Sequence, residues 1–139
     1  MAMERREEPV DPRELRRRLL AVHRELLSGQ VIEAERATGH SLRPGEVLGA
    51  AMEDPRFAWL REISGMVADL DAELAAARSE NRPPDVASTI TRARRLVAPP
   101  DAATGFGRAY LRSLQRNPGV VIAHGDLSSL LGERSPATH

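Results

Sequence analysis

The sequence predicts an all-α fold, a single-domain helical bundle of four main helices with one or two short additional helices. Three observations support this class. Leu, Ala and Val recur three and four residues apart, which is the period of a helix that buries one face. Three Asx-Pro pairs, beginning at Asp11, Asp54 and Asn117, join a capping side chain to a proline suited to the first helical turn. Aromatic residues make up only 3% of the chain, and β-branched runs are short, which disfavours a sheet.

The composition excludes several classes of protein. The chain has 139 residues, a length typical of one domain, and no cysteine, so disulfides and thiolate metal sites are excluded. Its 20 basic residues, all arginine, balance 20 acidic ones, so no net field attracts nucleic acid or a membrane surface. No apolar run reaches the roughly 20 residues of a membrane span. Because Met1–Glu8 lacks the apolar core of a signal peptide, a cytoplasmic location is expected.

The first helix is expected directly after a charged segment, residues 1–10, which is predicted to be disordered. Asp11 provides the cap, and the helix is expected over Pro12–Thr38, ending where Gly39 can adopt a left-handed conformation. Its buried stripe is expected to hold apolar side chains one turn apart: Leu15, Leu19, Val22 and Leu26.

A small helix and the expected central helix follow. The small helix is predicted over Glu46–Glu53, with its buried side made of Val47, Leu48, Ala51 and Met52. The segment Pro55–Ser79 is then predicted to be one continuous helix at the centre of the bundle, because two adjacent apolar lines run along it. The only tryptophan, Trp59, lies on one of these lines and is predicted to be largely buried.

Three further helices complete the prediction. The prolines at 83–84 interrupt the chain, and helices are expected over residues 85–97, 105–116 and 119–131. Residues 133–139 are expected to form a disordered tail, which leaves residues 11–132 as the helical bundle domain.

Two histidines are the first candidates for a functional site. His23 and His124 each have apolar neighbours at helical spacing, so each is placed on or beside an apolar face. They are interpreted as structural, because a metal needs several converging ligands and no metal-binding spacing of histidine and glutamate is present. The alternative is a His-lined pocket, built from both, that binds a small ligand or a metal. That pocket would need a shared polar neighbour such as Glu33, Glu35 or Asp71. No cofactor is assigned.

Charged residues suggest two further interpretations. The acidic residues Asp69, Asp71 and Glu73 lie on the expected central helix, where Asp69 and Glu73 share a face and Asp71 points elsewhere. That face could bind a cation or serve in acid/base chemistry, but a solvated polar face opposite arginines is expected. Clustered arginines suggest phosphate contacts and a DNA-binding regulator, although interleaved acids and a net charge of zero make nucleic acid an unlikely partner. These arginines are Arg13, Arg16, Arg17, Arg18, Arg94 and Arg95.

Several stretches resemble a family of small bacterial helical proteins. The most specific is Asp54-Pro55-Arg56-Phe57-Ala58-Trp59-Leu60, which matches an Asp-Pro-x-Phe-Ala-Trp-Leu motif. The segments Leu20–Leu27 and Asn117–Gly125 are similar as well, so the resemblance covers most of residues 15–132. It implies a bacterial, helical, non-secreted protein, and since the family carries no assigned activity, it implies no catalytic residues.

We therefore expect a small intracellular, non-enzymatic binding or accessory protein that acts through helical protein–protein interaction. A homodimer is expected, with the first or the central helix in the interface, because the chain has more apolar helix face than a minimal bundle needs. A further partner surface would comprise Trp59, Arg56 and Arg61, if the indole is exposed. The His-lined pocket and the DNA-binding regulator remain the second and third interpretations.

Overall fold

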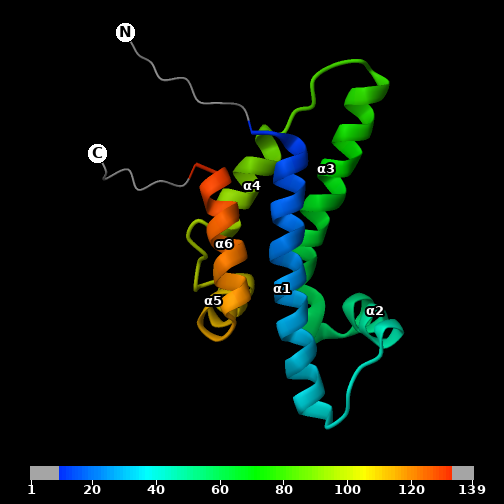
Figure 1. Ribbon diagram of the computed structural model, residues 1–139, viewed down its shortest axis with the longest axis vertical. Coiled ribbons are helices and arrows are strands. Elements are labelled where there is room, and N and C mark those ends of the chain that lie inside the picture. The colour runs from blue at the N-terminus through cyan, green and yellow to red at the C-terminus, as the bar shows by residue number, and fades with distance from the viewer. Residues whose placement is uncertain (1–9, 133–139) are drawn as a thin grey trace, which may run out of the picture.

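The computed structural model describes residues 10–132, which form six α-helices and one 3-10 helix (Figure 1). In chain order they are α1 (Pro12–Thr38), α2 (Pro44–Glu53), η1 (Pro55–Leu60), α3 (Arg61–Ser79), α4 (Ala87–Val97), α5 (Gly105–Arg116) and α6 (Pro118–Leu130). The described residues contain no strand, so the all-α prediction is confirmed. The α-helices range in length from 10 to 27 residues. They do not divide into four main helices and one or two short ones, so that part of the prediction is not confirmed. Apart from Val10, the segments predicted to be disordered lie outside the described residues.

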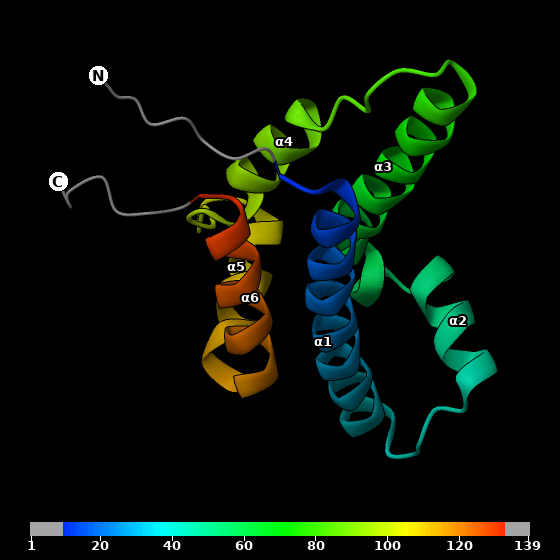
Figure 2. The same ribbon diagram turned by 45° about the horizontal axis from the view of Figure 1, so that its top comes forward.

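Helix α1 is the centre of the bundle. It contacts α3, η1, α5 and α6, and Figures 1 and 2 show it between α3 on one side and α6 on the other. Its predicted ends are confirmed: the Asp11 carboxylate accepts a hydrogen bond from the Arg13 N–H (3.0 Å), and Gly39 has a φ of 83°. The prediction that Pro55–Ser79 is the central helix is wrong. The longer α1 carries a stripe that contacts elements on both sides, whereas α3 packs at the edge.

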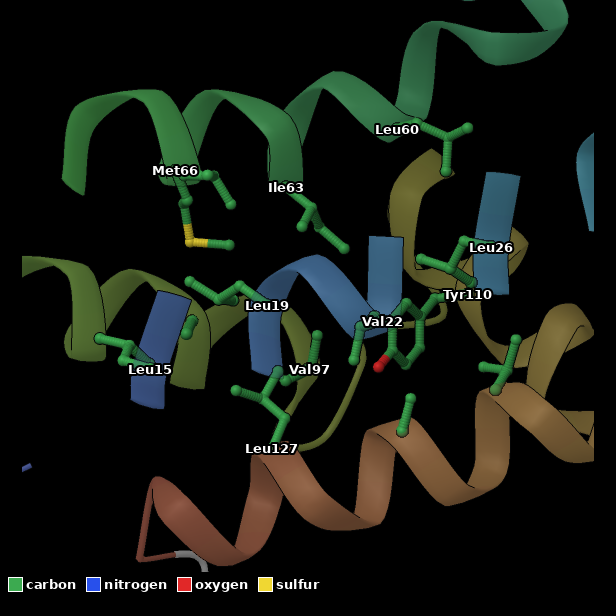
Figure 3. Close-up of a cluster of buried hydrophobic side chains, with 14 of the residues drawn as sticks. Leu15, Leu19, Val22, Leu26, Leu60, Ile63, Met66, Val97, Tyr110 and Leu127 are labelled. Carbon is green, nitrogen blue, oxygen red and sulfur yellow. The ribbon is translucent and has the colours of Figure 1, made fainter. Parts of the chain in front are cut away.

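The hydrophobic core forms around the apolar stripe of α1, as predicted. The four stripe residues are at most 1% exposed: Leu15, Leu19, Val22 and Leu26. Figure 3 shows these side chains between Ile63 and Met66 of α3 on one side and Leu127 of α6 on the other. The Tyr110 ring of α5 closes the core near Val22. Burial of this stripe supplies the main driving force for packing three helices against α1.

The segment after Asp54 is not the first turn of a long helix, as predicted, but the separate 3-10 helix η1. The Asp54 carboxylate caps it as expected, accepting from the Arg56 N–H (2.9 Å). In a 3-10 helix, side chains three residues apart eclipse one another. Phe57 and Leu60 therefore point together into the core, where they are 0% and 3% exposed. This tighter winding leaves Trp59 at the edge of the core.

Helix α2 stands apart from the bundle and has no buried residue. The prediction that Leu48 and Met52 are buried is wrong, since each side chain is 64% exposed. The helix contacts chiefly η1, and polar bonds hold its two ends. The Glu35 carboxylate accepts from the Leu42 N–H (2.8 Å) before it, and the Arg61 guanidinium donates to the Met52 carbonyl (2.6 Å) at its end. Sequence periodicity identified an apolar face here but could not show that nothing covers it.

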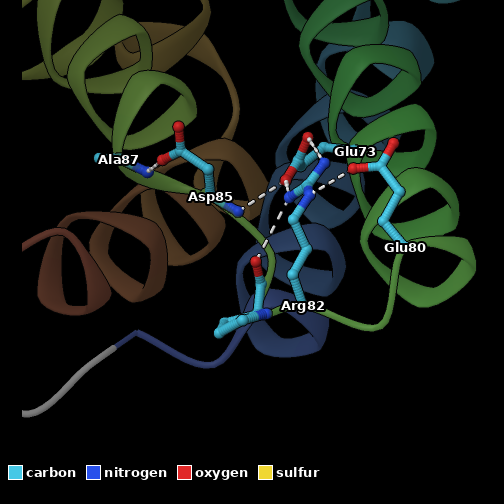
Figure 4. Close-up of polar contacts among 6 residues, drawn as sticks. Glu73, Glu80, Arg82, Asp85 and Ala87 are labelled. Carbon is cyan, nitrogen blue, oxygen red and sulfur yellow. Dashed lines mark hydrogen bonds and ion pairs between the residues drawn. The ribbon is translucent and has the colours of Figure 1, made fainter.

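A polar network fixes the connection from α3 to α4 (Figure 4). The Arg82 guanidinium donates to Glu73 (2.6 Å) and to Glu80 (2.7 Å), and the Glu73 carboxylate also accepts from the Asp85 N–H (2.7 Å). The Asp85 side chain then accepts from the Ala87 N–H (3.1 Å), at the start of α4. The prolines at 83–84 rule out a helix in this connection, so side chains take the place of helical backbone bonds.

Asn117 joins the junction between α5 and α6 to α1. The Asn117 side-chain oxygen caps α6 by accepting from the Gly119 N–H (2.8 Å), and its amide nitrogen donates to the Glu25 carbonyl of α1 (3.3 Å). The helix predicted over 105–116 is confirmed, and those predicted over 119–131 and 85–97 differ by one or two residues at their ends. In the part of the chain described, no helix combines the length and apolarity needed to span a bilayer.

Candidate functional site

The structure does not bring His23 and His124 together. The His23 ring is half-buried on the side of α1 that faces α2, and it lines a hollow of about 420 Å³. Burial lowers its pKa, and its ring nitrogens form no hydrogen bond to another described residue. His124 lies on α6, where its Nδ1 is 2.8 Å from the Tyr110 hydroxyl. The expected hydrogen bonding is therefore present for His124, whereas His23 has no partner among the described residues.

The polar residues proposed to connect the two histidines are bonded elsewhere. Glu33 pairs with Arg116 (2.9 Å), Glu35 accepts from the Leu42 N–H, and Asp71 pairs with Arg16 (2.6 Å). Among the described residues, no group of three or more His, Asp or Glu side chains is arranged to hold a metal ion. The two histidines therefore do not line a common cavity among those described, as the two-histidine pocket would require.

Ser128 is a contact of His124 that sequence analysis did not identify. Its hydroxyl lies 3.4 Å from the His124 Nε2, one helical turn along α6. Together with the Tyr110 hydroxyl, this makes a chain of three polar groups of the kind that activates a serine nucleophile. The serine–histidine distance is long, and the two residues lie one turn apart on the same helix. We therefore interpret the Ser128–His124 pair as a contact between neighbouring side chains on the surface of α6, and not as a catalytic pair.

The acidic face of α3 pairs with arginines, which confirms that prediction. Asp69 pairs with Arg92 (2.7 Å), and Glu73 with Arg82. Hydrogen bonds from the Arg82 guanidinium and from the Asp85 backbone N–H lower the pKa of the Glu73 carboxyl, because they stabilise its charged form. No acid of this set is left as a free cation ligand.

Several clustered arginines are likewise bonded within the protein. Arg17 and Arg18 pair with Glu14, and Arg18 lies 2.5 Å from that carboxylate. Arg94 donates two hydrogen bonds to the Leu131 carbonyl (2.9 and 2.5 Å). These contacts supply a structural reason for arginines that had suggested phosphate binding.

The further partner surface predicted from the sequence comprises Trp59, Arg56 and Arg61, and these residues have different surroundings in the structure. Arg56 pairs with Asp54 (2.8 Å), and Arg61 lines the hollow behind α2. The Trp59 indole is partly buried, which is less than the predicted burial in line with α3. Its ring packs edge-on against Phe106 (5.6 Å between centroids), and its Nε1–H donates to the Gln30 side chain (3.0 Å).

Two surface features result from this packing, and different sides of α1 line them. Figure 1 shows α2 and α5 on opposite sides of α1. One feature is the exposed face of α2 with the hollow behind it, named here the α2 face. It is lined by His23, Leu27, Ala51, Met52, Leu60, Arg61 and Ser64, with Leu48 exposed beside it. The other, named here the α1–α5 hollow, has a volume of about 720 Å³ and lies between α1 and α5 over Trp59. Its volume is in the range of small-molecule sites.

Comparison with known proteins adds no relative: no protein-family model, no curated protein and no solved structure gives a significant match to this chain.

Proposed function

We propose that this protein is a small, non-enzymatic binding or accessory protein that acts through helical protein–protein contact, with the α2 face as its contact surface. The supporting observation is that Leu48 and Met52, each 64% exposed, lie one helical turn apart on a helix that buries no side chain of its own. Apolar side chains gathered beside an apolar hollow are typical of surfaces that receive a helix of a partner. A bacterial, cytoplasmic setting is part of the proposal and can be checked by fractionation of host cells.

The proposed partner is a second copy of this chain, paired about a two-fold axis. We place α2 in the interface, in place of the first or central helix expected from the sequence, because its apolar residues are exposed. Gly45 and Gly49 flank Leu48 on α2, and a Cβ at either would meet nothing within 4 Å, so a second helix can approach this face closely. In an antiparallel pair, Leu48 and Met52 of one copy pack against the same residues of the other, as a two-fold interface requires.

The charges at the ends of α2 favour an antiparallel pair. Arg43 precedes the helix and Glu53 ends it, so each has the wrong sign for the dipole of its own helix. Neither forms an ion pair with another described residue. In an antiparallel pair the N-terminus of one α2 lies beside the C-terminus of the other. Arg43 of one copy then lies near Glu53 of the second, and each charge gains a favourable helix dipole.

Sedimentation velocity over a wide range of protein concentration tests this proposal. We expect a reversible dimer that is lost in Leu48→Ser and kept in Ile122→Ser, a matched control because Ile122 is 67% exposed on α6. Arg43→Glu and Glu53→Arg should each weaken the dimer, and the double variant should restore it. A monomer at every concentration, or a dimer insensitive to Leu48→Ser, would contradict the proposal.

A further inference from the structure

We propose that the α1–α5 hollow is a binding site for a small organic anion that carries a flat apolar group. This site is independent of the α2 face, because the two are lined by different sides of α1. Residues on one face of α1, at helical spacing from Glu25 to Arg36, form one wall. Residues of α5 from Ala109 to Arg116 form the other wall, and Trp59 lies between them.

The hollow exists because small residues occupy the positions that face it. Gly29 lies on α1, and a Cβ added there would meet only the Asn117 amide nitrogen, at 3.5 Å. Ala109 is the facing small residue on α5. A glycine inside a helix lowers helix stability by about 1 kcal/mol relative to alanine. Gly29 therefore destabilises α1 while it leaves open space in the hollow.

The charges of the hollow leave two arginines without a partner. Three arginines and two acids line it, and only one of the acids has a charged partner among the described residues. Glu33 pairs with Arg116 (2.9 Å). The Glu25 carboxylate lies against Gly119 in the first turn of α6, where a helix N-terminus favours an anion. The side chains of Arg36 and Arg112, by contrast, are exposed and form no hydrogen bond or ion pair with any other described residue, and both line the hollow.

These two guanidinium groups suggest the anionic part of the ligand. They line the hollow from different helices, Arg36 from α1 and Arg112 from α5, and we propose that one anion accepts hydrogen bonds from both. Planar guanidinium forks match carboxylate and phosphate oxygens, which can accept two parallel hydrogen bonds. A carboxylate or a phosphate ester therefore provides the chemistry that this part of the hollow can bind.

The apolar part of the lining defines the rest of the ligand. Trp59 and Ile32 both line the hollow, and Ile32 is 47% exposed. The indole is held by its hydrogen bond to Gln30 and by the Phe106 ring, so its orientation is set before a ligand arrives. A flat apolar group can stack on or pack against such a ring.

The indole N–H signal of Trp59 in a proton–nitrogen NMR spectrum tests the site directly, since the chain has a single tryptophan. The probes are naphthoate, naphthyl phosphate and the neutral isostere naphthamide. We expect both anions to shift the signal in a saturable way, and the neutral amide to bind at least about tenfold more weakly, because it lacks the charge that strengthens such hydrogen bonds. The tighter anion identifies the preferred charged group. No saturable shift with either anion, or equal binding of the amide, would overturn the proposal.

Variants locate the binding. Arg112→Gln and Arg36→Gln should each raise the dissociation constant of the anions by about tenfold, as expected when a charged hydrogen bond is lost. Arg95→Gln is the matched control, because Arg95 is exposed on α4 and does not line the hollow. Gly29→Met should abolish binding by filling the space, and a thermal unfolding curve verifies that this variant is folded. If these variants bind like the wild type, the probes bind elsewhere and the assignment is wrong.

Discussion

His23 shows how the burial of one side chain connects protonation to folding. Its imidazole is half-buried between α1 and α2, and burial lowers its pKa below the ordinary value of 6.5. The folded protein therefore favours the neutral ring, while the unfolded chain takes up a proton at the ordinary pKa. The contribution of the neutral His23 ring to the free energy of unfolding is fully present above about pH 6.5. This contribution declines as the pH falls toward the lower pKa of the ring in the folded state.

We expect His23→Gln to lose less stability than the wild type between pH 7.5 and pH 5.5, because glutamine does not titrate. Urea unfolding at the two pH values measures the difference, and comparison with the wild type cancels the contribution of the carboxylates. His40→Gln, which changes an exposed histidine, is the control and should behave as the wild type. If wild type and His23→Gln lose equal stability, the ring is hydrated in the folded protein.

Gly107 is a second residue whose role comes from its surroundings. It lies in the first turn of α5, where its N–H donates to the capping hydroxyl of Thr104 (2.8 Å) and the backbone of Asp101 packs against its Cα. A methyl group at this position would overlap the Asp101 carbonyl group. Backbone atoms cannot move aside as the end of a flexible side chain can, so the substitution must displace the turn.

We expect Gly107→Ala to destabilise the protein by about 1–3 kcal/mol, the usual cost of overpacking. Gly65→Ala on α3 is the control, because a Cβ there meets nothing within 4 Å, and it should raise stability by up to about 1 kcal/mol through helix propensity. Urea unfolding curves compare the two variants. A Gly107→Ala protein as stable as the wild type would show that the Asp101 turn yields easily.

At the scale of elements, the Asx-Pro pairs act as predicted. Asp11, Asp54 and Asn117 each accept a hydrogen bond from a backbone N–H two residues later. Asp11 therefore starts α1, and Asp54 and Asn117 each separate one helix from the next, because the residue before proline is held out of the helical region. Asp54 also pairs with the exposed Arg56, and this hydrogen bonding lowers the pKa of the Asp54 carboxyl.

We expect Asp54→Ala to cost about 0.5–2 kcal/mol through loss of the cap of η1. Asp54→Asn keeps an oxygen that can cap and loses only an exposed ion pair, so it should stay within about 1 kcal/mol of the wild type. Thermal and urea unfolding of both variants separate the cap from the charge. Equal losses in the two variants would mean that the ion pair with Arg56, and not the cap, stabilises this junction.

At the scale of the whole molecule, the apolar residues divide into those of the core and those of the α2 face. Leu19 is 0% exposed in the core, whereas Leu48 is 64% exposed on α2. Their side chains are identical, and sequence periodicity placed both on buried faces. Only the first is surrounded by other elements of the same chain.

We expect Leu19→Ala to destabilise the monomer by about 2–5 kcal/mol, as core truncations do. Leu48→Ala should change the stability of the monomer by no more than about 0.5 kcal/mol, as is usual at the surface. Urea unfolding in dilute protein, where dimerisation contributes least, measures both. A large loss in Leu48→Ala under these conditions would place this side chain inside the monomer and remove the α2 face as a docking surface.

Much of the candidate site could not be predicted from the sequence. His23 and His124 were identified by their apolar neighbours, yet helical spacing cannot show that two histidines belong to different surfaces. The α1–α5 hollow was missed, because Arg36 and Arg112 are 76 positions apart in the chain and line one hollow only through packing. The glycine at position 29 was a usable signal, since a residue that weakens a helix interior often marks a packing or binding requirement.

The sequence by itself determined the helical class, most helix ends and the buried stripe of α1. Caps, prolines and apolar periodicity act over a few residues, so these signals can be read locally. Only the tertiary structure decided that α1 is the central helix, that η1 winds separately, that α2 is uncovered and that the α1–α5 hollow exists. Each of these depends on which faces meet, and those contacts join residues far apart in the chain, where local propensity carries no information.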